Sequence, residues 1–145
     1  MKRTDFSVDW LFAACAPDTE LLPWNAQFTP VDLPHDWQIR HADDLYRDGT
    51  LFYRKYFFVT DVPGTRRMLW FGGAYMDTTV FVNGTEVGQW KYGYTSFWFD
   101  ITDALHEGQN EVLVRCNLRH PNSRWYSGAG LYRNVELWEA HDLHL

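Results

Sequence analysis

The chain has 145 residues, of which 46% are hydrophobic, 22% charged and 18% aromatic, and its formal net charge is −6. These values predict one globular domain and exclude nucleic acid as the expected partner, because no cluster of Lys or Arg exceeds a pair. No apolar run approaches the roughly 18 residues that a membrane span needs, so no membrane contact is expected either.

The cysteines and histidines exclude further classes. Cys15 and Cys116 are too few for a disulfide framework, and Cys116 is expected to be a buried thiol in a strand. The apolar run 10–16 is short and lies among acidic residues such as Asp9, which argues against a signal peptide. We therefore expect a cytoplasmic protein. The six His residues are scattered without metal-ligand spacing, so neither a metal site nor a cofactor is predicted.

The first third of the chain predicts a peripheral strand and an edge segment. Residues 5–14 alternate between apolar and polar side chains and predict a first, peripheral strand. Pro30 and Pro34 restrict residues 28–37 to an extended, edge-like conformation. The segment ends in the triplet His35–Asp36–Trp37. It is interpreted as a polar turn anchored by a buried indole, with an acid/base pair as the alternative.

From residue 51 onward the pattern indicates short strands separated by turns and almost no helix. Asn83–Gly84 is a hairpin signal, Gly72–Gly73 ends or bulges a strand, and residues 100–105 predict a helical turn capped by Asp100 or Thr102. A short helix is expected within residues 40–49. Such a series predicts an all-β fold, a two-sheet antiparallel sandwich. The strands are expected over residues 51–59, 66–71, 78–82, 86–90, 95–99, 111–118 and 131–138.

An irregular loop precedes the last strand. Pro121 removes a backbone donor, and Gly128 and Gly130 permit backbone angles that other residues avoid. The loop carries polar and aromatic side chains, which form a binding surface when a rigid sheet holds them. The alternative is a structural crossover in which the aromatic residues cap the core. The side chains concerned are Asn122, Ser123, Arg124, Trp125 and Tyr126.

Eight short motifs follow one another in a characteristic order, over residues 33–37, 53–57, 69–74, 80–84, 93–97, 100–102, 108–110 and 124–135. Together they resemble the N-terminal sugar-binding domain of glycoside hydrolase family 2, which includes β-galactosidases, β-glucuronidases and β-mannosidases. The last motif is most similar to bacterial β-galactosidases. The resemblance implies a jelly-roll β-sandwich of the galactose-binding-domain-like kind over residues 1–145.

The resemblance also implies that the catalytic residues lie elsewhere. In the family an immunoglobulin-like domain follows, and then a barrel that holds an acid/base and a nucleophilic glutamate. Retaining hydrolysis needs these two carboxylates about 5 Å apart. The neighbours Asp43–Asp44 point apart, and Asp36 and Asp100 lie on different segments. We therefore expect a fragment of a larger retaining exo-β-glycosidase, of the β-galactosidase type, with no catalytic residue of its own.

By resemblance, this domain shapes the substrate site for a β-galactoside or related oligosaccharide. Asn122 and Arg124 are expected to bind sugar hydroxyls, and Trp125 or Tyr126 to stack on a ring. Some members use an Asp in this loop, whereas residues 122–135 contain none. A second segment of the family corresponds to Arg54 and Lys55, which complete the predicted substrate-binding set.

Arg133 is expected to have a structural role, paired with a nearby carboxylate.

Two alternative functions remain open at this stage. In the first, the chain is an independent carbohydrate-binding module, a function that a fold of this kind permits. In the other it is an assembly domain, in which exposed aromatic residues contact sister domains or a second subunit of a homo-oligomer. The residues proposed for that contact are Trp24, Trp90 and Tyr92.

Overall fold

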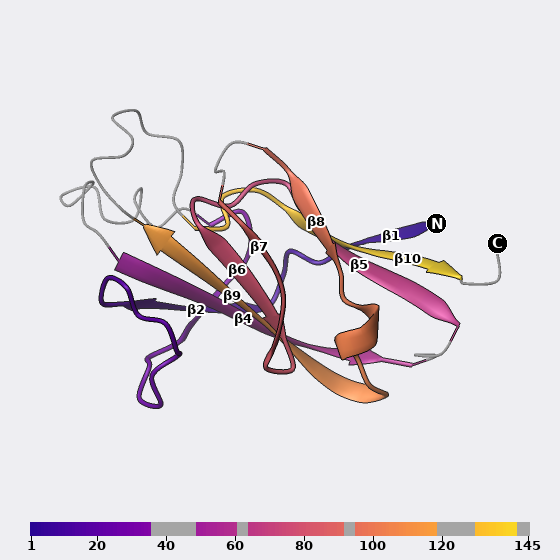
Figure 1. The fold of residues 1–145 in the computed structure, drawn as a ribbon, viewed down its shortest axis with the longest axis horizontal. Helices are drawn as coiled ribbons and strands as arrows, with labels where there is room; N and C mark the ends of the chain where they lie inside the picture. The colour runs from indigo at the N-terminus through magenta and orange to yellow at the C-terminus, as the bar shows by residue number, and fades with distance from the viewer. Residues whose placement is uncertain (36–48, 61–63, 92–94, 119–129, 142–145) are drawn as a thin grey trace.

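A computed structural model describes residues 1–35, 49–60, 64–91, 95–118 and 130–141 as a β-sandwich with one short 3-10 helix (Figure 1). The two sheets are antiparallel throughout, which confirms the predicted all-β jelly-roll sandwich. No helix in these ranges is long and apolar enough to cross a membrane. The elements are β1 (Lys2–Asp5), β2 (Trp10–Cys15), β3 (Thr29–Val31), β4 (Gly49–Val59), β5 (Thr65–Phe71), β6 (Thr78–Val82), β7 (Thr85–Trp90), β8 (Phe97–Asp100), η2 (Thr102–Ala104), β9 (Gly108–Leu118) and β10 (Val135–His141).

The strands form one sheet of four and one sheet of six. The four-stranded sheet has the order β1-β10-β5-β8, and the six-stranded sheet has the order β3-β2-β4-β9-β6-β7. Strands far apart in sequence are therefore neighbours, as when β4 pairs with β9 along eleven residues.

The core lies between the sheets and follows the alternation of each strand. Val112, Val114 and Cys116 of β9 are fully buried, which confirms the buried thiol predicted for Cys116, while the intervening Leu113 and Arg115 face the other side of the sheet. Each fully buried Val, Leu or Phe side chain contributes roughly 1.5–3 kcal/mol relative to exposure. The largest fully buried side chains include Trp10, Tyr53, Phe52, Phe71, Leu51 and Leu69.

The prediction of one peripheral strand over residues 5–14 is wrong. The segment forms β1 in the four-stranded sheet and β2 in the six-stranded sheet. The chain turns between them, where the Ser7 backbone N–H donates to Asp5 Oδ1 at 3.0 Å and Asp9 adopts a φ of 61°. The outer strand on this side is β3, which carries Pro30 as predicted for an edge.

The turn predictions agree with the structure, apart from the cap of the helical turn. Asn83 and Gly84 have φ values of 50° and 83° and join β6 to β7. Strand β5 ends at Phe71, directly before the glycine pair. The predicted helical turn is η2, but its N-cap residue is Ile101, without a side-chain cap, rather than Asp100 or Thr102. The Thr102 backbone N–H does donate to Asp100 Oδ1 at 2.9 Å. The helix expected within 40–49 falls on residues 40–48 outside the described ranges, and Gly49 already begins β4.

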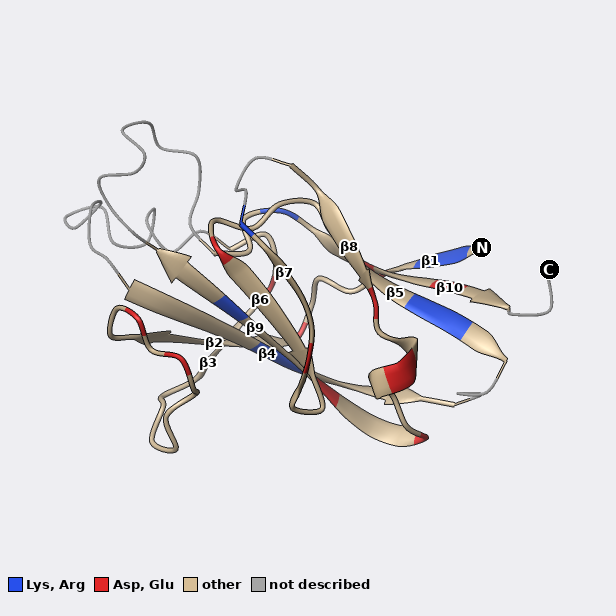
Figure 2. Ribbon diagram, in the orientation of Figure 1, with Lys and Arg blue, Asp and Glu red and all other residues tan. Residues whose placement is uncertain are grey.

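Two further details complete the fold. The last strand begins at Val135 rather than at the predicted Leu131. Before it, Gly130 forms an isolated bridge with Tyr75. In the described ranges, Lys and Arg are distributed over several strands of both sheets rather than gathered in one basic stripe (Figure 2).

Candidate functional site

The segments 36–48 and 119–129 are bounded by residues that meet at one end of the six-stranded sheet (Figure 1). Strand β4 begins at Gly49 and β9 ends at Leu118, and these two residues are partners in the ladder. On the other side, the His35 backbone N–H donates to the Leu131 carbonyl at 2.8 Å. We call these boundary residues the loop end. The predicted residues Asn122, Arg124, Trp125 and Tyr126 belong to a segment outside the described residues.

A buried histidine and a buried tyrosine lie beneath the loop end. His35 is 4% exposed, and its Nδ1 lies 2.7 Å from the hydroxyl oxygen of Tyr53, which is fully buried. The Phe12 ring packs against both, at centroid distances of 4.5 Å and 5.0 Å. The contact satisfies two polar groups that would otherwise be costly to bury. Asp36 and Trp37 lie outside the described residues, so the predicted turn anchored by a buried indole and its acid/base alternative both stay predictions.

Gly130 fixes the point where the chain re-enters the sandwich. It exchanges two backbone hydrogen bonds with Tyr75, of 2.8 Å and 2.9 Å, and has a φ of 87°. A Cβ atom at this position would lie 2.1 Å from the Tyr53 hydroxyl oxygen. Only glycine fits this combination of backbone angle and close contact.

Arg54 and Lys55 lie on opposite faces of β4, as successive strand residues do. The Arg54 guanidinium lies on the outer face, 4.2 Å above the Phe28 ring and 3.8 Å from the Glu111 carboxylate. By strand geometry Arg54 lies roughly 17 Å and Lys55 roughly 20 Å along β4 from Gly49 at the loop end. These two side chains thus do not form one site, and their predicted contact with substrate stays a prediction.

Lys55 stabilises the segment between β1 and β2, where the chain passes from one sheet to the other. Its side chain is buried, Nζ donates to the Val8 carbonyl, and the ammonium lies 4.6 Å from the Phe6 ring centroid. Burial lowers the pKa of the Lys55 ammonium, although nearby carboxylates, with Asp9 first, oppose the shift. These contacts explain why a lysine is accommodated inside the sandwich.

The carboxylate partner predicted for Arg133 is not found among the described residues. Among the described residues no carboxylate forms an ion pair with Arg133, whose side chain is exposed and whose guanidinium lies 5.6 Å from the Tyr132 ring centroid. It lines a groove of about 540 Å³ on the outer face of the four-stranded sheet, together with Trp70 and Glu136. Sequence reasoning missed this groove, although the tryptophans of β5 and β10 occupy strand positions that alternation turns away from the core.

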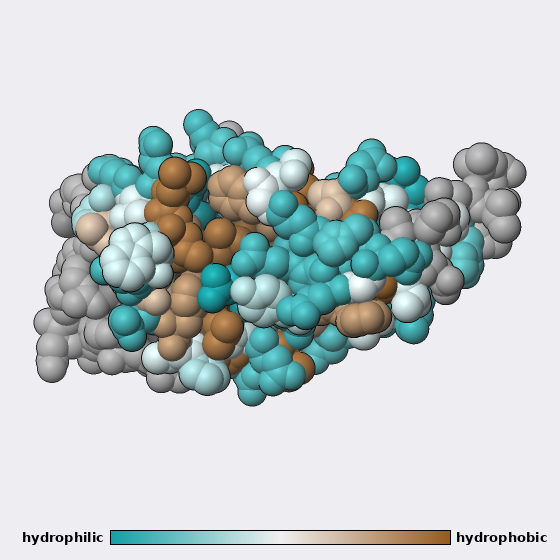
Figure 3. Space-filling model, turned by 90° about the horizontal axis from the view of Figure 1, so that it is seen from below, coloured by the Kyte–Doolittle hydropathy of each residue, from teal (hydrophilic) through white to brown (hydrophobic). Residues whose placement is uncertain are grey.

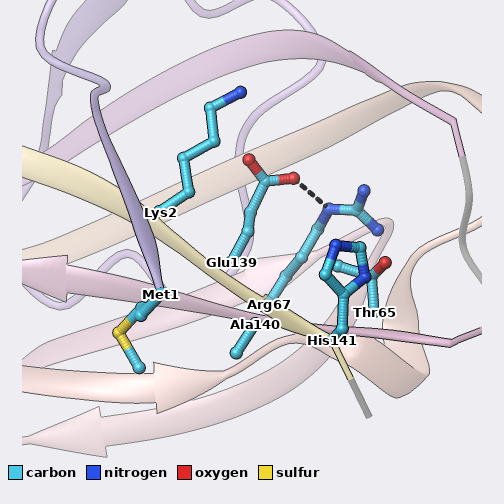
Figure 4. Close-up of a pocket in the computed structure, with 7 residues that line it drawn as sticks. All are labelled: Met1, Lys2, Thr65, Arg67, Glu139, Ala140 and His141. Carbon is cyan, nitrogen blue, oxygen red and sulfur yellow. Dashed lines mark hydrogen bonds and ion pairs between the residues drawn. The ribbon is translucent and has the colours of Figure 1, made fainter. Parts of the chain in front are cut away.

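A second cavity, of about 410 Å³, lies at the far end of the four-stranded sheet, lined by residues of β1, β5 and β10 (Figure 4). Its centre is an ion pair, in which Arg67 Nε donates to Glu139 Oε2 at 2.8 Å. Arg67 Nη2 also donates to the Thr60 carbonyl at 2.8 Å. The single carboxylate of this cavity is thus paired with a cation, so the cavity offers no carboxylate pair for glycoside hydrolysis.

Two other kinds of site, a metal site and an assembly contact, can be examined in the described part of the chain. No group of three His, Cys, Asp or Glu side chains there has the arrangement of a metal site. Of the aromatic residues proposed for assembly, Trp24 is 96% exposed, Trp90 packs partly against the core and Tyr92 falls outside the described residues. Seen from below, hydrophobic side chains gather on one part of the surface beside a broad hydrophilic part (Figure 3).

The described residues thus form an all-β domain of two antiparallel sheets. Residues 23–141 match the model of the sugar-binding domain of glycosyl hydrolases family 2. The chain therefore belongs to this family, as its motifs predicted.

Named relatives agree with this assignment. The chain is 37% identical over 163 residues to a β-galactosidase of Bacteroides ovatus, with 99% of this chain and 19% of the relative covered. It is 35% identical over 107 residues to a β-glucuronidase of Bacteroides fragilis, with 65% of this chain and 15% of the relative covered. The chain thus spans less than a fifth of the length of these curated relatives.

Solved structures show the same fold. A family 2 glycosyl hydrolase from Bacteroides cellulosilyticus superposes with a TM-score of 0.83 at 30% identity, over 97% of this chain and 21% of that chain. A β-glycosidase from Bacteroides vulgatus superposes with a TM-score of 0.80 at 26% identity, over 97% of this chain and 20% of that chain.

Proposed function

We propose that this chain is the N-terminal accessory domain of a retaining exo-β-glycosidase that acts on β-galactosides, and that it shapes the substrate site without performing the chemistry. The observation that carries the proposal is the loop end. The residues that bound segments 36–48 and 119–129 lie together there on one part of the sandwich, which we call the frame. The His35–Leu131 and Gly49–Leu118 pairings set that frame. Segments anchored on a rigid sheet in this way are suited to ligand contact.

The partners in this proposal are the other parts of the same enzyme. An immunoglobulin-like domain and a barrel with two catalytic glutamates supply the acid/base and the nucleophile. Glu136 is the carboxylate that lines one cavity of the described residues and Glu139 the one that lines another, and neither of these two cavities supplies a carboxylate pair. This division of labour agrees with the small share of each relative that the chain spans.

The substrate contacts in this proposal come from the segment 119–129. The Arg124 guanidinium and the Asn122 amide bind sugar hydroxyls, because both groups supply directed donors. The Trp125 or Tyr126 ring packs on the apolar face of the pyranose. Such contacts act on substrate binding, so their loss should appear mainly in KM.

The test is a kinetic comparison in the complete enzyme that contains this chain. Arg124→Ala and Trp125→Ala should each lower kcat/KM for an aryl β-galactoside by about tenfold or more, mainly through KM. Phe58→Ala is the matched control, because that ring is 75% exposed near the end of β4 farthest from Gly49. Unchanged kinetics in both loop variants would contradict the proposed role of this segment.

A further inference from the structure

The outer face of the four-stranded sheet carries tryptophans in register. Leu69 and Phe71 are fully buried, so Trp70 between them points away from the core. Across the ladder Trp70 is directly opposite Trp98 of β8, which is 54% exposed. On its other side Trp70 is opposite Glu136 of β10. The register therefore brings two indoles and a carboxylate from three strands together on one surface.

A third tryptophan extends this surface. Trp138 stacks with Trp70 at a centroid distance of 6.0 Å and an interplanar angle of 9°. The Trp138 indole N–H donates to Glu136 Oε1 at 2.8 Å, and the Arg3 guanidinium lies 4.6 Å from the Trp138 ring centroid. The hydrogen bond orients the Glu136 carboxylate beside the ring system, so an acceptor is fixed next to an aromatic surface.

The groove lies on this face, where Trp70 and Glu136 line it. It has a volume of about 540 Å³, within the range of about 300–1,000 Å³ that small-molecule sites occupy. Its polar lining includes Ser96, Arg133, Asn134 and Glu136, beside the rings of Trp70 and Tyr132. Both Arg133 and Asn134 are exposed, so their polar groups are accessible to a ligand.

The glycine pair after β5 lets the polar wall of the groove approach the sheet. A Cβ atom on Gly72 would lie 3.1 Å from Arg133 Cβ and 3.3 Å from a ring atom of Trp70. A Cβ atom on Gly73 would lie 2.9 Å from the Tyr132 hydroxyl oxygen. The Gly72 backbone N–H also donates to the Asn134 carbonyl at 2.9 Å. The segment from Tyr132 to Asn134 therefore packs closely against Gly72 and Gly73, because neither glycine has a side chain that would keep it away.

We propose that this groove is a saccharide subsite for a neutral hexopyranoside, separate from the loop end. A pyranose has an apolar C–H face and a rim of hydroxyls, and the groove offers Trp70 and Tyr132 to the first and Glu136, Arg133 and Asn134 to the second. A carboxylate accepts hydrogen bonds and a guanidinium donates them, so the two groups together suit hydroxyls, which do both. A largely apolar protein interface would leave this mixed polar lining unpaired.

The proposal is tested with the 15N-labelled 145-residue chain and methyl β-galactopyranoside, added to about 50 mM, well above a millimolar Kd. The indole N–H resonances of Trp70 and Trp138 should shift on titration, because one ring lines the groove and the other donates to Glu136. Arg133→Ala and Glu136→Gln should each weaken binding about tenfold. Glu86→Gln, on the exposed β7 of the other sheet, is the matched control and should bind as the parent does. Sorbitol, an acyclic polyol without a flat apolar face, should cause no shift.

Three results would overturn the proposal. One is an absence of shifts, which would favour a protein partner for this face. Another is a set of shifts that both variants leave unchanged. The third is a set confined to residues around His35 and Gly130, which would place the sugar at the loop end. Because the readout is binding by this chain alone, it can fail while the loop variants of the complete enzyme still show the kinetic effect proposed above.

Discussion

The hydroxyl oxygen of Tyr53 lies 2.7 Å from Nδ1 of His35, in the interior of the sandwich directly beneath the loop end. The same hydroxyl lies where a side chain at position 130 would otherwise project. Tyr53 therefore connects three parts of the frame: the strand β4, the end of the segment before 36–48, and the return of the chain at Gly130. The stability of this frame can be tested independently of any sugar.

Gly130→Ala should destabilise the chain strongly. The new methyl group would overlap the Tyr53 hydroxyl, and alanine at a φ of 87° is strained, so the loss should exceed the roughly 1 kcal/mol of the backbone effect alone. Urea unfolding followed by tryptophan fluorescence measures the change. Gly64→Ala is the matched control, because Gly64 has a φ of 84° but a Cβ atom added there would meet nothing within 4 Å. Equal losses in both variants would contradict the steric account.

Tyr53→Phe should lower the free energy of unfolding by about 1–3 kcal/mol. It removes the hydroxyl that His35 Nδ1 contacts, while it leaves the ring packed on Phe12. Tyr56→Phe, on the same strand but 46% exposed, should change stability by less than about 0.5 kcal/mol. Denaturant unfolding of the two variants provides the comparison, and similar effects at both positions would contradict the importance of the buried contact.

Lys55→Met should change the dependence of stability on alkaline pH. The pKa of Lys55 is lowered by burial in the folded state, so between that pKa and the higher unfolded value the unfolded chain binds more protons. The parent should therefore gain stability relative to Lys55→Met as pH rises through this window. Unfolding curves of both chains at neutral and at alkaline pH give the difference directly. A difference that stays constant with pH would exclude a lowered pKa.

Cys15 should react with a thiol reagent before Cys116 does. Burial raises the pKa of both thiols, that of Cys116 to about 12, and Cys116 is fully buried whereas Cys15 is only partly so. Since the thiolate is the reactive form, labelling of native protein should occur at Cys15, and Cys116 should react only on unfolding. Mass spectrometry of peptides after brief labelling identifies the site. Equal native labelling would mean that the strand β9 opens readily.

Periodicity in the sequence predicted the long strands well, because burial on one face imposes alternation. The clearest case is β9, where Val112, Val114 and Cys116 form the buried side. The same reasoning joined β1 and β2 into one strand, because the apolar alternation from Phe6 to Phe12 continues through the turn. A backbone angle such as that of Asp9 carries too weak a signal in sequence to mark the break.

The site was less predictable, because its contacts join residues that only the strand register brings together. Phe12 lies opposite Tyr53 through the pairing of β2 with β4. Trp70 and Trp98 likewise meet only through the pairing of β5 with β8. Arg133 was expected beside a carboxylate because of its residue type. Its position in the chain did not reveal that it borders an open groove. Sequence alone gives residue types and local faces, whereas such sites depend on which strands become neighbours.

The central claim is that this domain contributes substrate contacts to chemistry performed elsewhere in the enzyme. The most direct measurement is the release of nitrophenol from p-nitrophenyl β-galactoside by the 145-residue chain and by the complete enzyme at equal molar concentration. We expect hydrolysis by the complete enzyme and a rate equal to the uncatalysed blank for the chain alone. Hydrolysis by the chain alone, above that blank, would contradict the account.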